Sequence, residues 1–518
     1  MASEMKGRTA KSARNAVFGV GSYFITLILQ MINRTVFVHV LATEYLGLNG
    51  LFSNILSLLS LSELGVGTAI TYALYRPIAE KNYEKIKSIM QLFKRVYEVI
   101  GCFILIVGAV LTPFLPYLIK DMPDIPYIHI IYLLYVLDSG ISYFYSYKRI
   151  FIVSCQDEYI STTSQTIRNV AVKLLQILFL VLTHNFIVYL VVQIVCTRVE
   201  NIVISKIADK MHPFLKDKEV TPLPKEDKAE IKKNVGAMVF HKVGEVIVNT
   251  TDNLILSTCM GLNIVGLISN YTLIINSVHT VFQKMMNSMT ASVGNLVADS
   301  DKDKAMMVFR RVLFLNFAVY FFGFICLTCL LQPFIELWVG ADLKVDFAVV
   351  IVFAIYFYVS GMRTTVLIFR NAAGLFWRDR YKALVEGIVN LAFSIPLTLM
   401  FGAVGVRAGT IISCLGVAFW VEAYVLYKDY FGKGMLRYMV TQLCYLLFCG
   451  VCCVGIYYAL EYTVWMGGWI GLCIRLVECV VLAAVLFCIV FFRNENFKYY
   501  FGLMKRILHR GKAGNKEV

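Results

Sequence analysis

Charged residues are scarce in this chain. They make up 16% of its 518 residues, whereas a soluble protein has about 25%. Hydrophobic residues account for 58%, and apolar runs long enough to cross a bilayer recur from Asn15 to Phe492. This pattern excludes a soluble globular protein. We expect an all-α polytopic membrane protein with about fourteen transmembrane helices.

The predicted spans follow from hydropathy and length alone. The segment Met1–Arg14 is basic and polar and runs directly into the first span, so we expect no cleavable signal peptide. The spans are predicted near residues 15–38, 49–75, 88–119, 126–152, 159–183, 185–206, 233–258, 263–297, 305–332, 347–371, 380–402, 404–427, 438–462 and 466–492.

Motifs for nucleotide and zinc chemistry are also missing. The chain has no phosphate-binding loop, no dinucleotide fingerprint and no HExxH helix. Its 14 cysteines lie within apolar spans, singly or as Cys452–Cys453, which indicates small buried hydrophobes rather than disulfides or metal ligands. We therefore expect no enzyme, no catalytic residue, no metal site and no cofactor beyond a proton or sodium ion.

The net charge of +15 reflects topology rather than nucleic-acid binding. Lys and Arg gather in alternate connecting segments, and the other segments hold almost none, with Lys120, Lys344 and Arg407 as exceptions. This is the positive-inside pattern. It places both termini in the cytoplasm, and the surplus charge faces anionic lipid headgroups.

One long polar segment interrupts the apolar pattern. Ala208–Lys233 contains three prolines and many charges, as expected of a cytoplasmic linker. We therefore predict a first lobe at residues 1–207, a linker at 208–232, a second lobe at 233–432, and two extra helices with a basic tail at 433–518.

The two predicted lobes begin with similar polar stripes. His241, Glu245, Asn249 and Asp252 recur at spacings of 4, 4 and 3, which places them on one helix face. Subtracting 219 from each number leads to a second such stripe, formed by Ser22, Thr26, Gln30 and Asn33. Lipid cannot satisfy a polar face. We therefore interpret the halves as an internal repeat whose stripes line one central cavity.

The helix that follows each stripe strengthens this interpretation. Gly47-Leu48-Asn49 resembles Gly261-Leu262-Asn263 at an offset of 214, and Gly50-Leu51 resembles Gly266-Leu267 at an offset of 216. For any one Ser or Thr, plain helix packing is the simpler explanation. The polar stripes of these helices comprise Ser53, Ser57, Ser60, Glu63, Gly67 and Thr71 in one, and Thr272, Asn276, Thr280, Gln283, Asn287 and Thr290 in the other.

Ionisable residues inside the spans are candidates for function, because exposing them to hydrocarbon costs at least about 2.5–3.5 kcal/mol. A basic set could form an anion site, since guanidinium groups suit phosphate oxygens. An acidic set could neutralise these cations or bind a coupling proton or sodium ion. Structural ion pairs between helices are an equally good reading for any one residue. The basic set is Arg34, Lys173, Arg198, Lys242 and Arg363, and the acidic set is Glu63, Asp138, Glu245 and Asp252.

A short motif in the second span resembles a known family. Leu61–Ala69 reads LSELGVGTA, which resembles the SE-(L/F)-G-(L/I)-G-x-A signature of bacterial polysaccharide transporters, the Wzx-type flippases of lipid-linked oligosaccharides. The basic N-terminus, the Gly47–Gly50 region and Thr251-Asp252 are also similar to that family. It belongs to a superfamily that includes the lipid II flippase and the MATE drug exporters.

The resemblance implies two six-helix lobes related by pseudo-two-fold symmetry, with spans one, two, seven and eight lining a central cleft. It implies transport of an undecaprenyl-pyrophosphate-linked oligosaccharide across a bacterial plasma membrane for capsule, exopolysaccharide or O-antigen-type synthesis, in company with a polymerase and other assembly proteins. The last two spans would form a groove for the polyprenyl tail. Substrate-binding residues would be the basic set together with Gln30, Asn33, Asn249, Asn276 and Gln283.

Three alternatives remain open at this point. A MATE-like ion-coupled drug antiporter has the same fold, although acidic rather than basic residues would dominate its cavity. A membrane glycosyl polymerase needs a long outside loop, and none is predicted. A scaffold without transport activity would tolerate neutralisation of every charge in the cavity. The membrane potential or an ion gradient could drive transport, since one charge is worth about 2.3 kcal/mol per 100 mV.

Overall fold

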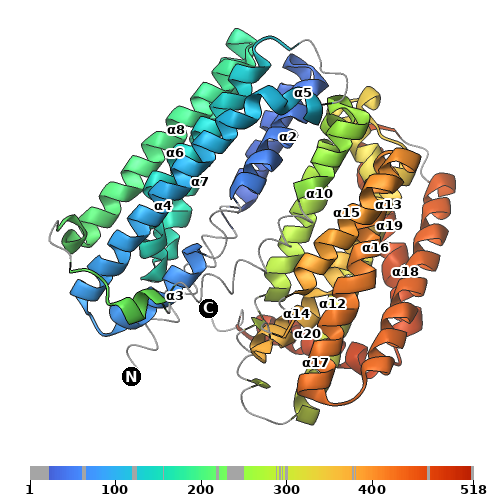
Figure 1. Cartoon of the computed structure of the whole chain (residues 1–518). Helices are drawn as coiled ribbons and strands as arrows, with labels where there is room; N and C mark the ends of the chain where they lie inside the picture. The colour runs from blue at the N-terminus through green and yellow to red at the C-terminus, as the bar shows by residue number, and fades with distance from the viewer. Residues whose placement is uncertain are drawn as a thin grey trace. The chain divides into compact units, whose positions relative to one another are not determined.

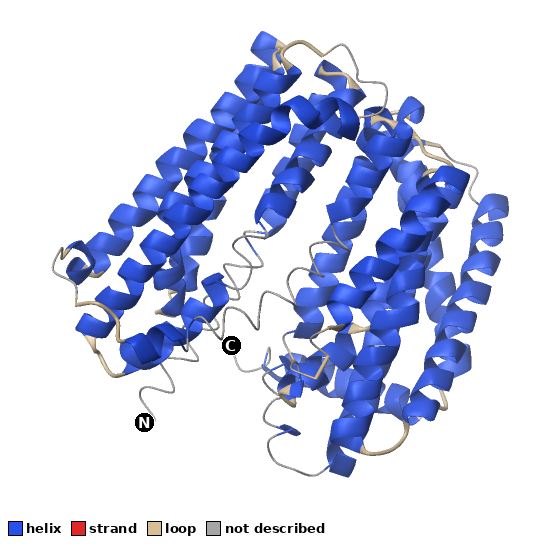
Figure 2. Cartoon of the chain, viewed as in Figure 1, coloured by secondary structure: helices blue, strands red, loops and turns tan. Residues whose placement is uncertain are grey.

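Helices account for nearly all of the regular structure. The computed structural model describes residues 21, 23–60, 66–119, 125–155, 157–217, 221–229, 231, 250–287, 289–290, 293, 296–297, 302–375, 378–379, 381–463 and 467–514. In these ranges the chain forms helices joined by loops and turns, and no strand (Figure 2). The prediction of an all-helical chain is confirmed.

Twelve helices in the described ranges are long and apolar enough to cross a membrane. They correspond to twelve of the fourteen predicted spans. The other two predicted spans, 49–75 and 233–258, contain residues 61–65 and 233–249, which lie outside the described residues. The chain is thus a multi-pass membrane protein, while the count of fourteen and the side on which the termini lie stay predictions.

The chain divides into two compact units. The first unit consists of residues 1–269 with 383–388, and the second consists of residues 270–382 with 389–518. Residues 250–269 thus group with the first unit, although they follow the predicted linker. The lobe boundaries predicted from the sequence stay predictions, and each unit is described here by itself.

The first unit is built from long antiparallel helices (Figure 1). A helix at Tyr23–Val40 precedes them. Two capping residues set where later helices begin: the side chains of Asn82 and Asn185 accept hydrogen bonds from the main-chain nitrogens of Lys85 and Ile187. The labelled elements are α2 (Thr43–Leu59), α3 (Val66–Ala79), α4 (Tyr83–Leu111), η2 (Thr112–Phe114), α5 (Leu115–Leu118), α6 (Ile128–Ser154), α7 (Glu158–Thr183), α8 (Phe186–Met211) and η3 (Pro213–Lys216).

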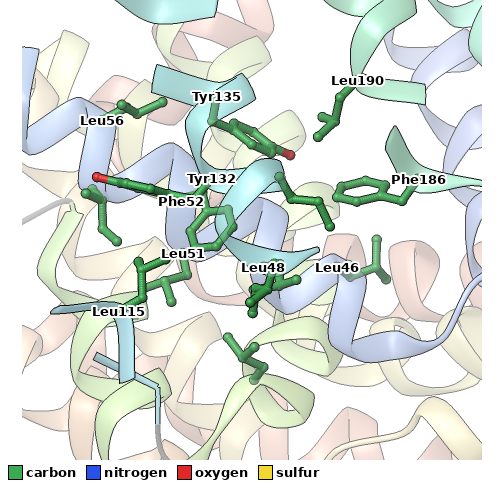
Figure 3. Packing of buried hydrophobic residues seen from close by; sticks show 14 of the residues in the cluster. Leu46, Leu48, Leu51, Phe52, Leu56, Leu115, Tyr132, Tyr135, Phe186 and Leu190 are labelled. Carbon is green, nitrogen blue, oxygen red and sulfur yellow. The ribbon is translucent and has the colours of Figure 1, made fainter. Parts of the chain in front are cut away.

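Aromatic side chains hold α2 against α6. The ring centroid of Phe52 lies 5.1 Å from that of Tyr132 and 5.7 Å from that of Tyr135, and all three rings lie among leucines of α2 (Figure 3). The Tyr135 hydroxyl donates a hydrogen bond to the Asn49 side chain, so its polar end is satisfied inside an apolar cluster. This cluster fixes the face that α2 presents to α6.

The predicted linker is docked rather than free where it is described. Lys85 in α4 forms an ion pair with Asp227 at 2.9 Å, and the Ser88 hydroxyl donates to the main-chain oxygen of Thr221 at 2.6 Å. Leu223 is buried in the same apolar cluster as α4. The linker therefore covers one end of α4.

A reciprocal contact joins α2 to the start of α10 (Leu262–Asn287). A Cβ atom on Gly47 would lie 2.1 Å from the main-chain oxygen of Leu262, and one on Gly266 would lie 2.4 Å from that of Thr43. Both glycines are required, because the two backbones touch. Thr43 corresponds to Leu262, and Gly47 to Gly266, at the same offset of 219 that relates the polar stripes.

A second pair of reciprocal contacts has the same offset of 219. Arg34 donates a hydrogen bond to Ser269, and Asn253 Nδ2 lies 3.5 Å from the Cβ position of Gly50. Arg34 and Asn253, like Gly50 and Ser269, differ by 219. Contacts that exchange in this way are the signature of a two-fold relation. The offsets of 214 and 216 proposed from sequence similarity were wrong: the three-dimensional repeat keeps one register, which motif matching missed.

The second unit packs around one long helix. The helix α12 (Lys302–Val339) contacts α13 (Phe347–Met362), α18 (Met435–Thr463) and α19 (Gly468–Phe491). Phe317 of α12 stacks on Tyr445 of α18 with ring centroids 3.8 Å apart. The other elements are η4 (Ala341–Leu343), α14 (Thr364–Ala372), α15 (Lys382–Phe401), α16 (Ala403–Ser413), η6 (Cys414–Ala418), α17 (Phe419–Leu426), η7 (Tyr427–Phe431) and α20 (Glu495–Gly514).

The glycine contact leads to a stability prediction. Gly47→Ala places a methyl group against the backbone of Leu262, and overpacking of this kind costs about 1–3 kcal/mol. We expect a lower thermal unfolding temperature for the purified full chain in detergent. Gly450→Ala in α18 is the matched control, because a Cβ atom there meets nothing within 4 Å. Equal unfolding temperatures for the two variants would refute the close contact.

Candidate functional site

A polar pocket of about 430 Å³ lies inside the first unit. Four helices form its walls: α2, α6, α7 and α8. Its volume falls within the range of small-molecule sites, about 300–1,000 Å³. The residues that line it are Ser53, Leu56, Ser57, Ser60, Tyr135, Asp138, Ser139, Ser142, Ser146, Arg149, Gln165, Arg168, Gln193, Thr197, Glu200 and Asn201.

One charged pair of the pocket is fully engaged. Arg149 donates to a carboxylate oxygen of Glu200 and, at 3.3 Å, to the side-chain oxygen of Asn201. The Ser164 hydroxyl donates to the other oxygen of Glu200 at 2.7 Å. Both oxygens of this buried carboxylate are therefore satisfied, as a charge at this depth requires.

A second pair is looser. The Nη2 atom of Arg198 donates to the main-chain oxygens of Leu137 and Asp138 at 2.9 and 3.1 Å, and it lies 3.9 Å from Oδ1 of Asp138. The other carboxylate oxygen of Asp138 accepts a hydrogen bond from Gln193 at 3.0 Å. Asp138 and Arg198, both predicted from the sequence, thus lie side by side.

Further cations continue from the pocket through the same unit. Lys173 lies within electrostatic range of both Arg34 and Arg168, and its ammonium group donates to Gln176 at 3.3 Å. The Gln176 amide in turn donates to Gln193 at 3.5 Å. Hydrogen bonds therefore connect Lys173 to Asp138, and three of the five predicted basic residues, Arg34, Lys173 and Arg198, share one unit.

The remaining predicted polar residues have mixed surroundings. Asn33 is buried and donates to the Tyr189 hydroxyl at 2.8 Å, and Asp252 is also buried. Gln30, Asn276 and Gln283 are exposed on the surfaces of their own units. Four further predictions, Glu63, Lys242, Glu245 and Asn249, fall outside the described residues.

The fifth predicted cation belongs to a separate network in the second unit. Arg363 donates to both carboxylate oxygens of Glu422 at 3.0 and 2.6 Å, and Lys382 binds the same carboxylate. Glu422 is 1% exposed. Arg363 therefore ties the junction of α13 and α14 to α17, and a role in binding an anion stays a prediction.

The second unit also contains grooves beside α19. An apolar groove of about 320 Å³ runs between α10, α12 and α19, past Phe282, Phe334 and Leu476. A neighbouring groove of about 410 Å³ includes Gln332, Glu336 and Arg475. Leu472 lines both grooves. The surface beside α19 is therefore apolar in one groove and includes charged residues in the next.

Cysteines provide no alternative site. Two pairs in the second unit, Cys326 with Cys329 and Cys449 with Cys452, have the Cys-x-x-Cys spacing, which the sequence analysis overlooked. All 14 cysteines are free thiols. Among the described residues, no group of three His, Cys, Asp or Glu side chains is placed to hold a metal ion.

Several residues of the pocket were missed from the sequence. Arg149, Gln165, Arg168, Glu200 and Asn201 are not among the residues predicted from the sequence. The signal was present: Gln193, Thr197 and Glu200 recur at spacings of 4 and 3, the same pattern that identified the stripes in the lead helices. Applying that test to α7 and α8 would have located the pocket.

Solved structures with the same arrangement of helices are transporters. The chain matches a lipid II flippase, MurJ, in an inward closed conformation, with a TM-score of 0.67 and 13% identity over 92% of this chain and 98% of the flippase. It matches an inward-facing multidrug resistance MATE family transporter of the MOP superfamily, with a TM-score of 0.62 and 13% identity over 80% of this chain and 98% of the transporter.

A third match is a MOP superfamily transporter from Pyrococcus furiosus, with a TM-score of 0.53 and 10% identity over 82% of this chain and 96% of that protein. This chain has the fold of MOP superfamily transporters. The fold predicted from the sequence is confirmed to this extent. No protein-family model and no curated protein sequence matches the chain.

The Arg149–Glu200 pair leads to a second prediction. Glu200→Gln leaves Arg149 without its carboxylate partner, and the two side chains are only 17% and 6% exposed. Breaking such a buried pair by removing one partner should cost about 3–5 kcal/mol. Chemical denaturation of the purified chain measures this loss. Glu80→Gln is the control, because Glu80 pairs with exposed Arg76 and such pairs contribute about 0–1 kcal/mol. Similar losses in the free energy of unfolding for both variants would contradict the assignment of Arg149 and Glu200 as a buried ion pair.

Proposed function

We propose that this protein is a flippase for undecaprenyl-pyrophosphate-linked oligosaccharides, of the Wzx type, and works by alternating access in capsule, exopolysaccharide or O-antigen-type synthesis. The observation that carries the proposal is the polar pocket with its adjoining cations inside a MOP superfamily fold. A lipid-linked saccharide poses one physical problem: its polar head must cross hydrocarbon while its tail stays in lipid. Both parts of the substrate have a matching surface in this chain.

The first unit suits the polar head. Hydroxyl and amide groups of Ser57, Gln165 and Gln193 line the pocket, where they replace the water that hydrates a sugar. Lys173 and Arg34 lie beyond it in the same unit. Their positive charge would offset the charge of the pyrophosphate. A central cavity that also includes Lys242, Asn249, Asn276, Gln283 and Arg363 is part of the proposal.

The second unit suits the lipid tail. The apolar groove beside α19 gives an isoprenoid chain a hydrocarbon-like surface. The match to the MATE transporter takes in 98% of that protein but only 80% of this chain. The match to the lipid II flippase takes in 92% of this chain. The larger share supports counting α18 and α19 among the elements of a lipid-linked substrate flippase.

The reciprocal contacts support the alternating-access part of the proposal. Transporters built from repeats commonly alternate by moving repeats against each other as rigid bodies. Gly47 and Gly266 let the backbones of two corresponding helices touch. Small residues at such a contact leave fewer side chains to rearrange when two elements move against each other. Glu63, Asp138, Glu245 and Asp252 are the proposed sites of charge balance or of coupling to H⁺ or Na⁺.

Leaflet location of the substrate tests the proposal. Deleting the gene in its bacterial source should make lipid-linked saccharide accumulate on the cytoplasmic side of the plasma membrane. Purified protein in proteoliposomes should make all of a lipid-linked saccharide accessible to an impermeant sugar-modifying reagent, whereas protein-free vesicles protect the inner leaflet. Accumulation on the outer side would instead indicate a polymerase.

A variant ties flipping to the cations of the first unit. Lys173→Gln removes the charge while keeping a side chain that can hydrogen bond to Gln176. We expect the flipping rate in proteoliposomes to fall by about tenfold. Lys94→Gln is the control, because Lys94 is 54% exposed and lies 3.9 Å from Glu98. Equal flipping rates for Lys173→Gln and Lys94→Gln would show that the charge of Lys173 has no role in transport.

The MATE-like alternative predicts a different result. An ion-coupled drug antiporter should export a cationic dye and lose this activity in Glu63→Gln. The excess of Arg and Lys around the pocket disfavours a cationic substrate. Dye export by the purified chain, without any flipping of lipid-linked saccharide, would replace the flippase proposal.

A further inference from the structure

One cation of the polar pocket forms no direct ion pair with a carboxylate among the described residues. Arg149 is paired with Glu200, and Arg198 with Asp138. Arg168 donates only to the side-chain oxygens of Asn169, at 2.9 Å, and of Thr197, at 3.5 Å. Arg149 and Arg168 line the pocket together with the carboxylates of Asp138 and Glu200, and Arg168 is the lining cation without an ion pair among the described residues. This charge lies about 15 Å along α7 from its first residue, well inside the span.

Two hydrogen-bond donors beside that charge have no acceptor. The Nε atom of Arg168 and the Nδ2 atom of Asn201 are buried and without a hydrogen-bond partner among the described residues. Asn201 is 6% exposed, and its oxygen already accepts a hydrogen bond from Arg149, which assigns its nitrogen as the unpaired atom. Buried donors of this kind are costly unless a ligand supplies the acceptor. Both residues line the pocket.

The wall formed by the serines of α2 and α6 has the reverse character. Serines of α2 and α6 use their own hydroxyl protons on the helix backbone: Ser57 donates to the main-chain oxygen of Ser53 at 2.9 Å, and Ser142 to that of Ser139 at 2.6 Å. A hydroxyl that has given its proton away can still accept hydrogen bonds. This wall therefore accepts from donors such as sugar hydroxyl groups.

These features select one class of ligand. The donor wall requires an oxyanion, and the acceptor wall requires several hydroxyl groups on the same molecule. Inorganic phosphate or the pyrophosphate linker can bind the first wall but lacks the several ring hydroxyl groups that span the second, and a neutral sugar lacks the oxyanion. A volume of about 430 Å³ lies near the small end of the range for ligand sites, so it holds a sugar ring or two rather than a whole repeat unit.

We infer that this pocket is a specificity site for an acidic sugar, whose oxyanion binds Arg168 and Asn201 while its ring hydroxyls bind the serines of α2 and α6. The inference rests on the proposed function and deepens it, because it names which part of the saccharide the first unit recognises. The transported repeat unit then contains a uronic acid or another sugar with an acidic group.

Ligand titration of the purified full chain in nanodiscs tests this assignment. The probes are glucuronate, glucose and inorganic phosphate, followed by ligand-observed NMR. We expect glucuronate to bind at least about tenfold more tightly than either of the others, because only glucuronate meets both walls. If glucose binds as tightly as glucuronate, the inference is overturned. If phosphate binds as tightly as glucuronate, the site recognises the pyrophosphate linker. The assignment of an acidic sugar is then overturned.

Two variants separate recognition from folding. Arg168→Gln should weaken glucuronate binding by about tenfold or more and leave glucose binding unchanged. Asn201→Asp keeps the shape and the acceptor for Arg149 but replaces the unpaired donor with a negative charge, so it should abolish glucuronate binding in a chain that still folds. Arg76→Gln, in exposed surroundings, is the control. Unchanged glucuronate affinity in Asn201→Asp would refute the site.

The outcome is distinguishable from failure of the flippase proposal. If lipid-linked saccharide is flipped in proteoliposomes but acidic and neutral sugars bind alike, only the acidic-sugar assignment fails. If glucuronate binds through Arg168 and Asn201 but no lipid-linked saccharide is flipped, the pocket recognises an acidic sugar in a protein with another activity.

Discussion

The pairing of buried charge in the first unit is the constraint on which its architecture depends. A carboxylate or guanidinium group inside a membrane has no water to bind, so another helix must supply its partner. Glu200 of α8 meets Arg149 of α6 and Ser164 of α7. This one network sets the rotation of three helices at once, and the polar pocket is the space that those rotations leave.

The same constraint explains why the two units use charge differently. In the second unit the Arg363 and Lys382 side chains converge on Glu422, which is 1% exposed. Both cations of that network therefore serve one buried carboxylate. The first unit keeps Arg168 without a carboxylate partner and Asn201 with an unpaired donor. Buried polar groups without partners lower the stability of a folded protein, and such groups are typical of binding sites rather than of packing.

The internal repeat gains physical meaning from the glycine contact. Sequence similarity alone suggested offsets of 214 and 216 around Gly47 and Gly50, because short motifs such as Gly-Leu-Asn match in more than one register. The backbones decide the matter, since a Cβ atom on either Gly47 or Gly266 would overlap a main-chain oxygen of the other helix. The polar stripes predicted from the sequence share the offset of 219 with these exchanged contacts.

The sequence by itself determined the solvent in which the chain folds. Apolar runs, scarce charge and the spacing of polar residues predicted a helical multi-pass protein and a repeat, because these properties depend on the helix period and on transfer from water to lipid. Asp138, Arg198, Lys173 and Arg34 were also identified as charges within spans. Only the tertiary structure decided that these four lie together in the first unit while Arg363 binds Glu422. Which partner a buried charge meets depends on helix rotation and packing between segments far apart in sequence, and no local pattern records either of them.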